Sequence, residues 1–275
     1  MLLFPADVLR PRRVDDHFVP EAEAARELGV PYALVDHNAL TSGEATRAVA
    51  KVPEGEAIYR GWMLTSDEYA AFDTALAKRG ATLRTTAAQY RTAHELPGWH
   101  AALEPVTPAA EWTSGAGRAE FDEARRRLGH GPAVLRDYTK SMKHYWDEAV
   151  YIPSLTDADA AWRVASRFLE LRADDFAGGF VLRRFESFTG AEVRTWWYGG
   201  ECRLVGAHPD TPDTTPDGLD LAEVTPLVTA LALPFITVDL VRHDDGRWRV
   251  VELGDGQVSD RPASMSASDL VALLA

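Results

Sequence analysis

The sequence predicts an α/β unit followed by an α+β unit, and three observations lead to this fold class. Up to residue 96, short apolar runs alternate with helical patterns, which is typical of βαβ units and a parallel sheet. Beyond residue 118, apolar strand-like segments follow one another around turn signals such as Gly199-Gly200, which favours antiparallel strands. Residues 97–117 are rich in Pro, Thr, Ser and Gly without sustained periodicity, and we expect a linker there.

The first unit contains strand candidates at residues 31–35 and 57–64, besides the apolar "MLLF" at its start. Helical spacing over residues 18–28 and 66–79 ends in each case at a glycine, which is a natural C-cap. No GxGxxG pattern follows any of these strands. A nucleotide site of the dinucleotide-binding type is therefore not predicted in this half.

The second unit opens with helical spacing over residues 118–128 and carries a strongly periodic helix over 157–171. A further helix is expected over residues 219–231. Strands are expected at "GPAVLRDY", "GGFVLRRFESF", "AEVRTWWYGGECRLVGA" and in the hairpin "FITVDLVRHDDGRWRVVEL", after which the chain ends in a tail.

Composition and charge exclude several classes of protein. A single cysteine, Cys202, rules out an internal disulfide framework or a CxxC metal cluster. The net charge of −13 disfavours general nucleic-acid binding, although a nucleotide can bind where local cations oppose the overall field. The N-terminus lacks a signal-peptide pattern, and the longest apolar run, residues 227–241, is broken by Pro234. We therefore expect a cytoplasmic protein without a membrane partner.

Lysine is rare in this chain, which holds 25 arginines but only four lysines. Two of the four, Lys140 and Lys143, follow Arg136, which lies at the end of an apolar strand. Three cations within eight residues are suited to clamp a triphosphate. The alternative is a solvated basic loop whose cations pair with the neighbouring acids Asp137, Asp147 and Glu148.

The last hairpin places two carboxylates inside apolar strands. A two-residue turn at Asp245-Gly246 puts Asp239 directly opposite Glu252, a four-residue turn makes them diagonal, and only an odd loop separates them. Two like charges in that arrangement repel each other unless a cation lies between them, and magnesium bound with nucleotide phosphates is the usual solution. The alternative is an acid on an edge strand, paired with Arg242 or Arg249.

Arginines also occur inside two other predicted strands. Arg183 and Arg184 alternate faces at the end of one strand, with Glu186 beyond them. Arg194 is flanked by apolar residues and therefore needs an anion, which is either a protein carboxylate or a ligand.

The order of these segments resembles the ATP-grasp superfamily, in which two α+β subdomains hold ATP between them. More narrowly, the chain is similar to the divergent clade of predicted ligases named for one arginine and two lysines. The resemblance covers roughly residues 118–260 and is carried by "VLRDYTKSMKHYWDEA", "GGFVLRRFE", "EVRTWW" and "VDLVRHDDGRWRVVELGDGQVS".

The resemblance implies a domain organisation. Residues 1–117 would form a Rossmann-like pre-ATP-grasp domain, and residues 118–275 an ATP-grasp domain with subdomains at about 118–184 and 185–275.

The resemblance also implies roles for the site residues. Arg136, Lys140 and Lys143 would contact the ATP phosphates, and the hinge under adenine would comprise Arg183, Arg184, Phe185 and Glu186. Arg194 would bind phosphate or an acyl phosphate, with Lys143 assisting catalysis. Asp239 and Glu252 would hold Mg²⁺.

Two departures from the family pattern are visible. Arg136 stands where many ATP-grasp enzymes have Lys, which keeps the charge. The usual Glu-x-Asn metal motif is Glu252-Leu253-Gly254 here, so that Asp255 or Gln257 is expected to supply the missing oxygen.

The activity implied is ATP-dependent ligation of a carboxylate to an amine or another nucleophile, through an acyl phosphate and with release of ADP. Catalysis would rest mainly on positioning and charge neutralisation. The alternative is a nucleotide-binding ATP-grasp-like module without ligase turnover. Neither the carboxylate nor the nucleophile is specified by the sequence.

Overall fold

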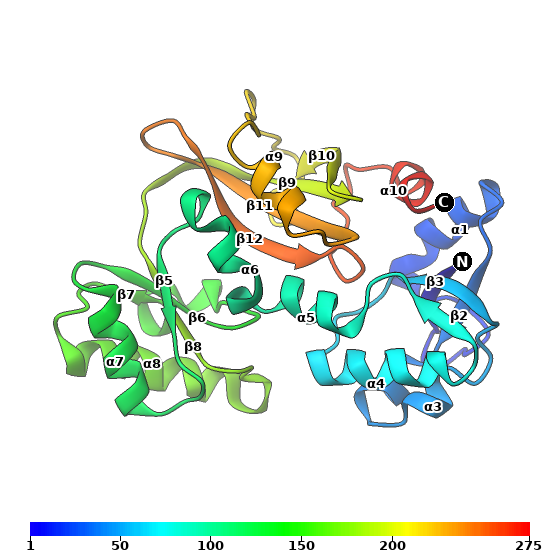
Figure 1. Ribbon diagram of the computed structural model, residues 1–275, viewed down its shortest axis with the longest axis horizontal. Helices are drawn as coiled ribbons and strands as arrows, with labels where there is room; N and C mark the ends of the chain where they lie inside the picture. Colours follow the sequence, from blue (N-terminus) through cyan, green and yellow to red (C-terminus); the bar gives the residue numbers. More distant parts are fainter.

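Three four-stranded sheets organise the chain in the computed structural model, which describes residues 1–275 (Figure 1). The first sheet is formed by strands within residues 2–83. The second is formed by strands within residues 110–184, and the third by strands within residues 188–255. The expected change from a parallel to an antiparallel architecture is confirmed.

The N-terminal sheet is parallel throughout. Its strands lie in the order β2 (Tyr32–Val35), β1 (Leu2–Pro5), β3 (Gly55–Tyr59) and β4 (Ala81–Leu83). Successive side chains of a strand point to opposite faces of the sheet, and both faces carry buried apolar side chains. Helices therefore cover both faces. Leu2 and Phe4 pack toward α1 (Val19–Glu27) and the C-terminal α10 (Ala267–Leu274). On the other side lie α2 (His37–Thr41), α3 (Ala45–Ala48) and α4 (Ser66–Ala77).

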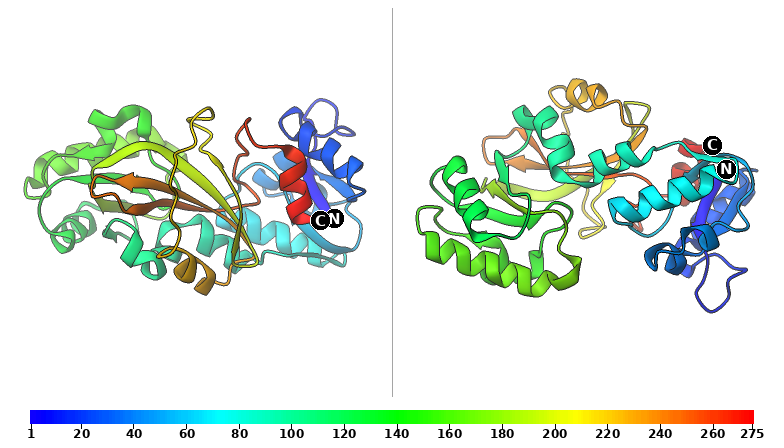
Figure 2. Two further views of the ribbon diagram at one scale, coloured as in Figure 1. Left: turned by 90° about the horizontal axis from the view of Figure 1, so that it is seen from above. Right: turned by 60° about the horizontal axis from the view of Figure 1, so that its bottom comes forward.

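The C-terminal helix α10 was not predicted, since we expected a tail there. It returns the chain to the N-terminal sheet, where Leu270, Val271 and Leu274 are buried. The two termini consequently lie side by side in each of the views (Figure 2).

The second sheet has the order β5 (Ala110–Trp112), β8 (Phe180–Arg184), β6 (Ala133–Asp137) and β7 (Tyr151–Ile152). Two helices, α7 (Arg118–Leu128) and α8 (Ala158–Arg172), pack on it through a core that includes Phe121, Phe168 and Phe180. Both helices begin and end within a residue of their predicted bounds.

The expected linker at residues 97–117 is wrong, because this segment is folded. It contains most of α6 (Leu96–Leu103) and the whole of β5, which pairs with β8. Pro97 stands in the first turn of α6, where its missing N–H costs no hydrogen bond, so that the Pro signal marked a helix start.

The third sheet is antiparallel, in the order β10 (Glu201–Ala207), β9 (Phe188–Tyr198), β11 (Phe235–His243) and β12 (Trp248–Asp255). The turn between β9 and β10 is the predicted one, with positive φ at Gly199 and Gly200. The remaining α-helices are α5 (Ala87–His94) and α9 (Thr225–Ala230), the latter shorter than expected. Short 3-10 or π-helical turns cover residues 16–18, 104–106, 143–145, 146–150 and 173–175.

The β11–β12 hairpin differs from the prediction in its turn but agrees in its outcome. The His243 N–H donates to the Arg247 carbonyl at 2.8 Å, so the loop has three residues, an odd number. A β-bulge then shifts the register between Asp239 and Leu240, and Asp239 lies opposite Glu252 as predicted.

None of the helices has both the length and the apolar character that are needed to span a membrane.

Candidate functional site

Two adjoining cavities lie between the second and third sheets, and together they are lined by all the site residues predicted from the sequence except Gln257. We call the first, of about 450 Å³, the polar chamber; it contains Lys140, Lys143, Arg194, Asp239, Glu252 and Asp255. We call the second, of about 290 Å³, the aromatic chamber; it contains Arg136, Lys143, Arg183, Arg184, Phe185, Glu186 and Glu252. Lys143 and Glu252 line both, so the two chambers form one cleft.

A row of three charged residues crosses the third sheet at the floor of the cleft. The register places Arg194 of β9 opposite Asp239 of β11, and Asp239 opposite Glu252 of β12. Arg194 donates to both carboxylate oxygens of Asp239, at 2.8 and 2.7 Å. The anion that Arg194 requires is therefore supplied by the protein. The positive charge of Arg194 also reduces the repulsion between Asp239 and Glu252.

The Arg194–Asp239 pair is buried and strongly polarised. Burial by itself raises the pKa of Asp239, but the charge and hydrogen bonds of Arg194, with a contribution from His208, bring it down to about 2. Burial opposes the charged form of Arg194 too, yet Asp239 holds the pKa of the guanidinium above its usual value. Both groups are thus charged in the cleft at neutral pH.

Glu252 is the more accessible of the two acids, with a side chain 35% exposed. Its nearest cation is Arg136, whose Nη2 lies 3.6 Å from Oε1. Burial raises the pKa of Glu252, but Arg136, Lys140 and Lys143 outweigh it and bring the pKa below the ordinary value. Glu252 is therefore an ionised carboxylate that no arginine holds at two points.

A local turn positions Lys140. The buried carboxylate of Asp137, at the end of β6, accepts the backbone N–H groups of Thr139 at 2.8 Å and Lys140 at 2.7 Å. This Asx-type turn aims Lys140 into the polar chamber, where burial and then the nearby arginines lower the pKa of its ammonium. An anionic ligand arriving there would relieve this unfavourable concentration of positive charge.

Lys143 follows in a 3-10 turn, Lys143–Tyr145, and remains half exposed. Its Nζ lies 3.6 Å from Glu192 and 3.4 Å from Asp210. Burial lowers the pKa of the ammonium, whereas Glu192, Glu252 and Asp210 raise it, with a net increase. The alternative of a basic loop paired with Asp137, Asp147 and Glu148 does not describe this lysine.

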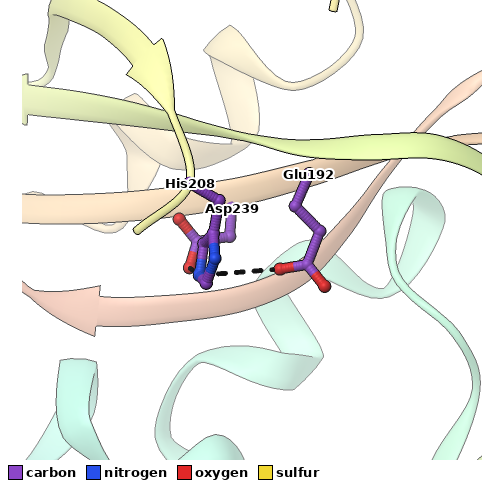
Figure 3. Close-up of side chains that lie close together, drawn as sticks. All are labelled: Glu192, His208 and Asp239. Atoms are coloured by element: carbon purple, nitrogen blue, oxygen red, sulfur yellow. Dashed lines mark ion pairs between the residues drawn. The ribbon is translucent and has the colours of Figure 1, made fainter. Parts of the chain in front are cut away.

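Glu192, His208 and Asp239 form a compact cluster beside the charged row (Figure 3). Their ligand atoms lie within 4.8 Å of one another, a spacing that a metal ion can bridge. The cations of Arg194 and Lys143, however, already balance the charges of Asp239 and Glu192. His208 Nε2 itself lies 3.2 Å from Arg194 Nη2, so the cluster is an ion-pair network in this structure.

The rings of Trp146 and Phe185 line the aromatic chamber, and Tyr151 packs against both. Trp146 and Tyr151 stack at 5.7 Å, and Phe185 meets both edge-on. Trp146 and Phe185 are partly exposed, which leaves ring surface free for a ligand. Beside them, Arg184 binds the carbonyls of Leu128 and His130 rather than the cavity.

Glu186 also serves the structure rather than the cavity. It binds Arg249 through two hydrogen bonds, each of 2.8 Å, which join the β8 hinge to β12. Arg249 was expected as a possible partner of the hairpin acids, and its real partner lies in the segment between β8 and β9.

Asp255 and Gln257 lie where β12 meets the N-terminal unit. The amide of Gln257 is fully engaged: its oxygen accepts from the Tyr59 N–H at 3.0 Å, and its nitrogen donates to Tyr69 and Asp255. Gln257 is therefore not free to replace the missing Asn. Asp255 is 1% exposed, its Oδ2 has no partner, and burial raises its pKa to about 7.

The residues of the cleft fit a magnesium ion. Hard carboxylate oxygens are the ligands this cation prefers, and Glu252 and the unpartnered Oδ2 of Asp255 offer them in the polar chamber, whereas both oxygens of Asp239 also accept hydrogen bonds from Arg194. The adjoining cations Lys140 and Lys143 stand where phosphate oxygens of a metal–nucleotide complex would be neutralised.

His94, at the end of α5, provides a test of the electrostatics in the polar chamber. Burial first, and then the charge of Lys140, lower its pKa from 6.5 to about 4. The unfolded chain thus takes up the proton more readily, and stability present above pH 6.5 is lost as the pH falls through 4.

We expect His94→Gln to flatten the fall in unfolding free energy between pH 6.5 and 4, by at most about 3 kcal/mol. Urea denaturation across this pH range measures the effect. His130→Gln, at an exposed position outside the cleft, is the control and should keep the wild-type pH profile. Parallel profiles for His94→Gln and the wild type would contradict the lowered pKa.

Several cleft residues were missed by the sequence analysis. These are His94, Trp146, Phe188, Glu192, His208, Asp210, Thr237, Ser259 and Asp260. Most of them stand alone in strands or loops without a recognisable spacing. Glu192 and Arg194 at positions i and i+2 of one strand were the available signal, since they share a face.

Comparisons with known proteins identify the family and the fold of this chain. Residues 127–274 match the model of an ATP-grasp domain family, family 3 of the clade named for one arginine and two lysines. The crystal structure of an ATP-grasp RimK domain protein from Sphaerobacter thermophilus is 18% identical, with a TM-score of 0.62, covering 100% of this chain and 98% of its own. D-cycloserine synthetase DcsG is also 18% identical, with a TM-score of 0.64, covering 100% and 99%.

A third similar structure is the ATP-grasp ligase PsnB in complex with a minimal precursor, Mg and ADP. It is 13% identical, with a TM-score of 0.59, and covers 99% of this chain and 97% of its own. The curated proteins contain no match. The family model spans more than half of the chain and includes the basic loop and the Asp239–Glu252 hairpin, and the chain therefore belongs to the ATP-grasp domains, in family 3 of the arginine-and-two-lysines clade.

Proposed function

We propose that the protein is an ATP-dependent ligase that joins a carboxylate to an amine or similar nucleophile through an acyl phosphate, with release of ADP. The observation that carries the proposal is the cleft itself. It brings the cations Arg136, Lys140 and Lys143 against the carboxylates Asp239 and Glu252, beside a chamber walled by aromatic rings. Residues 1–117 and 118–275 serve as the pre-ATP-grasp and ATP-grasp domains in this proposal, the latter divided at about residue 184.

ATP would bind across both chambers. The adenine ring would occupy the aromatic chamber, against Trp146 and Phe185, with hinge residues 184–186 alongside. The side chain of Arg183, the first residue of the expected hinge, instead binds the carbonyls of Val250 and Val251. The phosphates extend toward Lys143, which lines both chambers, and toward Lys140 in the polar chamber. Mg²⁺ would be held by Asp239 and Glu252 with Asp255, and it would neutralise charge on the phosphates.

The chemistry has two steps. A substrate carboxylate oxygen attacks the γ-phosphorus, the bond to the β–γ bridging oxygen breaks, and ADP leaves with that oxygen. The amine then attacks the acyl carbon, phosphate leaves, and the amine proton passes to the surrounding groups. Lys140, Lys143 and Arg136 offset the charge that moves onto the phosphates, and Arg194 would hold the acyl phosphate by exchanging a hydrogen bond that it makes to Asp239.

A second candidate is a nucleotide-binding module without turnover, and two observations favour it. Gly254 occupies the place of the family Asn, and Arg194 engages both oxygens of Asp239. Such a module would bind ATP in the same cleft but release no ADP with any carboxylate and amine.

The deciding experiment measures adenine-nucleotide binding with Mg²⁺ and then analyses products in a screen of carboxylates with amines. Substrate-dependent ADP and phosphate are expected. AMP and pyrophosphate as stoichiometric products would contradict the acyl-phosphate route, and failure to bind any adenine nucleotide would contradict the whole proposal. Tight ATP binding without ADP release across a broad screen would favour the module.

Asp255→Asn tests whether this residue replaces the missing Asn. Because burial already favours the uncharged form of Asp255, we expect the isosteric amide to leave the melting temperature unchanged or slightly higher. If Oδ2 contacts the metal, the Mg²⁺ concentration needed for half-maximal ADP binding should rise about 10-fold. An unchanged Mg²⁺ requirement would remove Asp255 from the metal site.

A further inference from the structure

Arg183 is a buried cation with no carboxylate partner. It is 7% exposed, and its Nη1 and Nη2 atoms donate to the carbonyls of Val251 at 2.6 Å and Val250 at 3.3 Å. Nη2 also donates to the Thr107 hydroxyl at 2.9 Å, while Nε has no partner. Burial lowers the pKa of this guanidinium to about 9. Burying a charge without a partner of opposite charge costs folding free energy. What Arg183 provides, and an apolar side chain would not, is its set of hydrogen bonds to Val250, Val251 and Thr107.

Val250 and Val251 are the residues of the β-bulge in β12. Leu240 pairs with Val250 and Asp239 pairs with Glu252, so Val251 is the extra residue between two regular stretches of the ladder. Thr107 donates a second hydrogen bond to the Val250 carbonyl, at 2.7 Å. The bulge carbonyls are therefore bound from the side of the neighbouring sheet, by Arg183 of β8 and the segment before β5.

The bulge decides which way Glu252 points. The three-residue turn at the hairpin tip sets a register in which Arg242 pairs with Trp248 and Val241 with Arg249. Continued without a bulge, that register would place Val251 opposite Asp239 and Glu252 opposite Val238, which is fully buried in the apolar core. A one-residue slip moves a side chain to the other face of a sheet.

We propose that Arg183 is a positioning residue, which clamps the Val250–Val251 bulge and thereby turns the Glu252 carboxylate into the cleft. The clamp needs a planar fork with several N–H donors, because it binds two successive carbonyls at once. In this role Arg183 acts on the metal through the backbone and makes no contact with the nucleotide. The consequence for metal binding rests on the proposed function, whereas the effect on the bulge does not.

The test compares ADP affinity with saturating Mg²⁺ and with EDTA, in the wild type and in Arg183→Met. The gain in affinity that Mg²⁺ provides should fall about 10- to 100-fold, as expected for a residue that supports a metal ligand. The Mg²⁺-free affinity should change much less, because the Arg183 side chain binds the β12 carbonyls and not the nucleotide. An equal loss in both conditions would show that Arg183 contacts the nucleotide directly, and an undiminished Mg²⁺ gain would show that the bulge does not need it.

Two further variants keep the test decisive if Arg183→Met folds poorly. Arg183→Lys retains the charge without the fork and should lose part of the Mg²⁺ gain. Thr107→Val removes one donor to the Val250 carbonyl and should show a smaller loss. Arg203→Met is the matched control, because Arg203 is an exposed arginine of the same sheet as the bulge and pairs with Glu201, and both of its ADP affinities should equal those of the wild type.

Hydrogen exchange in the ligand-free protein tests the clamp separately from the function. Residues 247–255 should exchange faster in Arg183→Met than in Arg203→Met. Equal rates would overturn the clamp, whatever the nucleotide data show. If instead the wild type binds ADP without any effect of Mg²⁺, the metal role in the proposed function fails, and the exchange rates still decide the role of Arg183.

Discussion

Asp239→Asn and Glu252→Gln are both expected to lower substrate-dependent ADP release at least about 100-fold, but with different effects on stability. Each substitution neutralises one of the carboxylates that we propose to hold Mg²⁺. Asp239 is also the buried partner of Arg194, and neutralising it leaves that guanidinium uncompensated. We therefore expect Asp239→Asn to cost about 3–5 kcal/mol of unfolding free energy.

Glu252→Gln should leave stability nearly unchanged, because Glu252 is partly exposed and its contact with Arg136 is 3.6 Å long. Product analysis measures ADP release, and denaturant unfolding measures stability. Glu201→Gln is the control, since Glu201 is an exposed acid of the same sheet, paired with Arg203. Wild-type Mg²⁺ dependence in Glu252→Gln would rule out the metal assignment, however stable the variant is.

Lys140→Ala and Lys143→Ala are each expected to weaken ATP binding about 10- to 100-fold, the contribution of one charge-assisted contact to phosphate. Their effects on the ligand-free protein should be small. Burial, and then the neighbouring arginines, lower the pKa of Lys140, so removing its ammonium relieves an unfavourable charge and should leave the melting temperature the same or higher. Lys143 loses only contacts of 3.4 and 3.6 Å to Asp210 and Glu192.

Calorimetric titration with a non-hydrolysable ATP analogue and Mg²⁺ measures both losses. The two lysines outside the cleft, Lys51 and Lys78, provide matched controls, since both are exposed in the N-terminal unit. Lys51→Ala and Lys78→Ala should bind the analogue like the wild type. Undiminished affinity in Lys140→Ala and Lys143→Ala would show that the loop is an ordinary solvated surface.

Helices α7 and α8 were predicted within a residue because their signals are local. Apolar side chains repeat every three to four positions, and Gly117 precedes α7 while Asp157 caps α8 through its carboxylate. The segment 97–117 was misread for the same reason. Its Pro and Gly are compatible with a helix start as well as with a loop, and only pairing with β8 makes β5 a strand.

The sequence by itself identified charged residues that line the cleft, namely the two lysines of the loop after β6 and the two acids of the last hairpin. Tertiary structure decided how these groups are used. In the folded chain Asp239 pairs with Arg194, and Glu252 stays accessible. Gln257 accepts a hydrogen bond from Tyr59 of the N-terminal unit. The bulge at Val251 also brings Asp239 opposite Glu252, although the hairpin loop has an odd number of residues. Such partners come from segments far apart in the chain, and side-chain spacing along one strand carries no information about them.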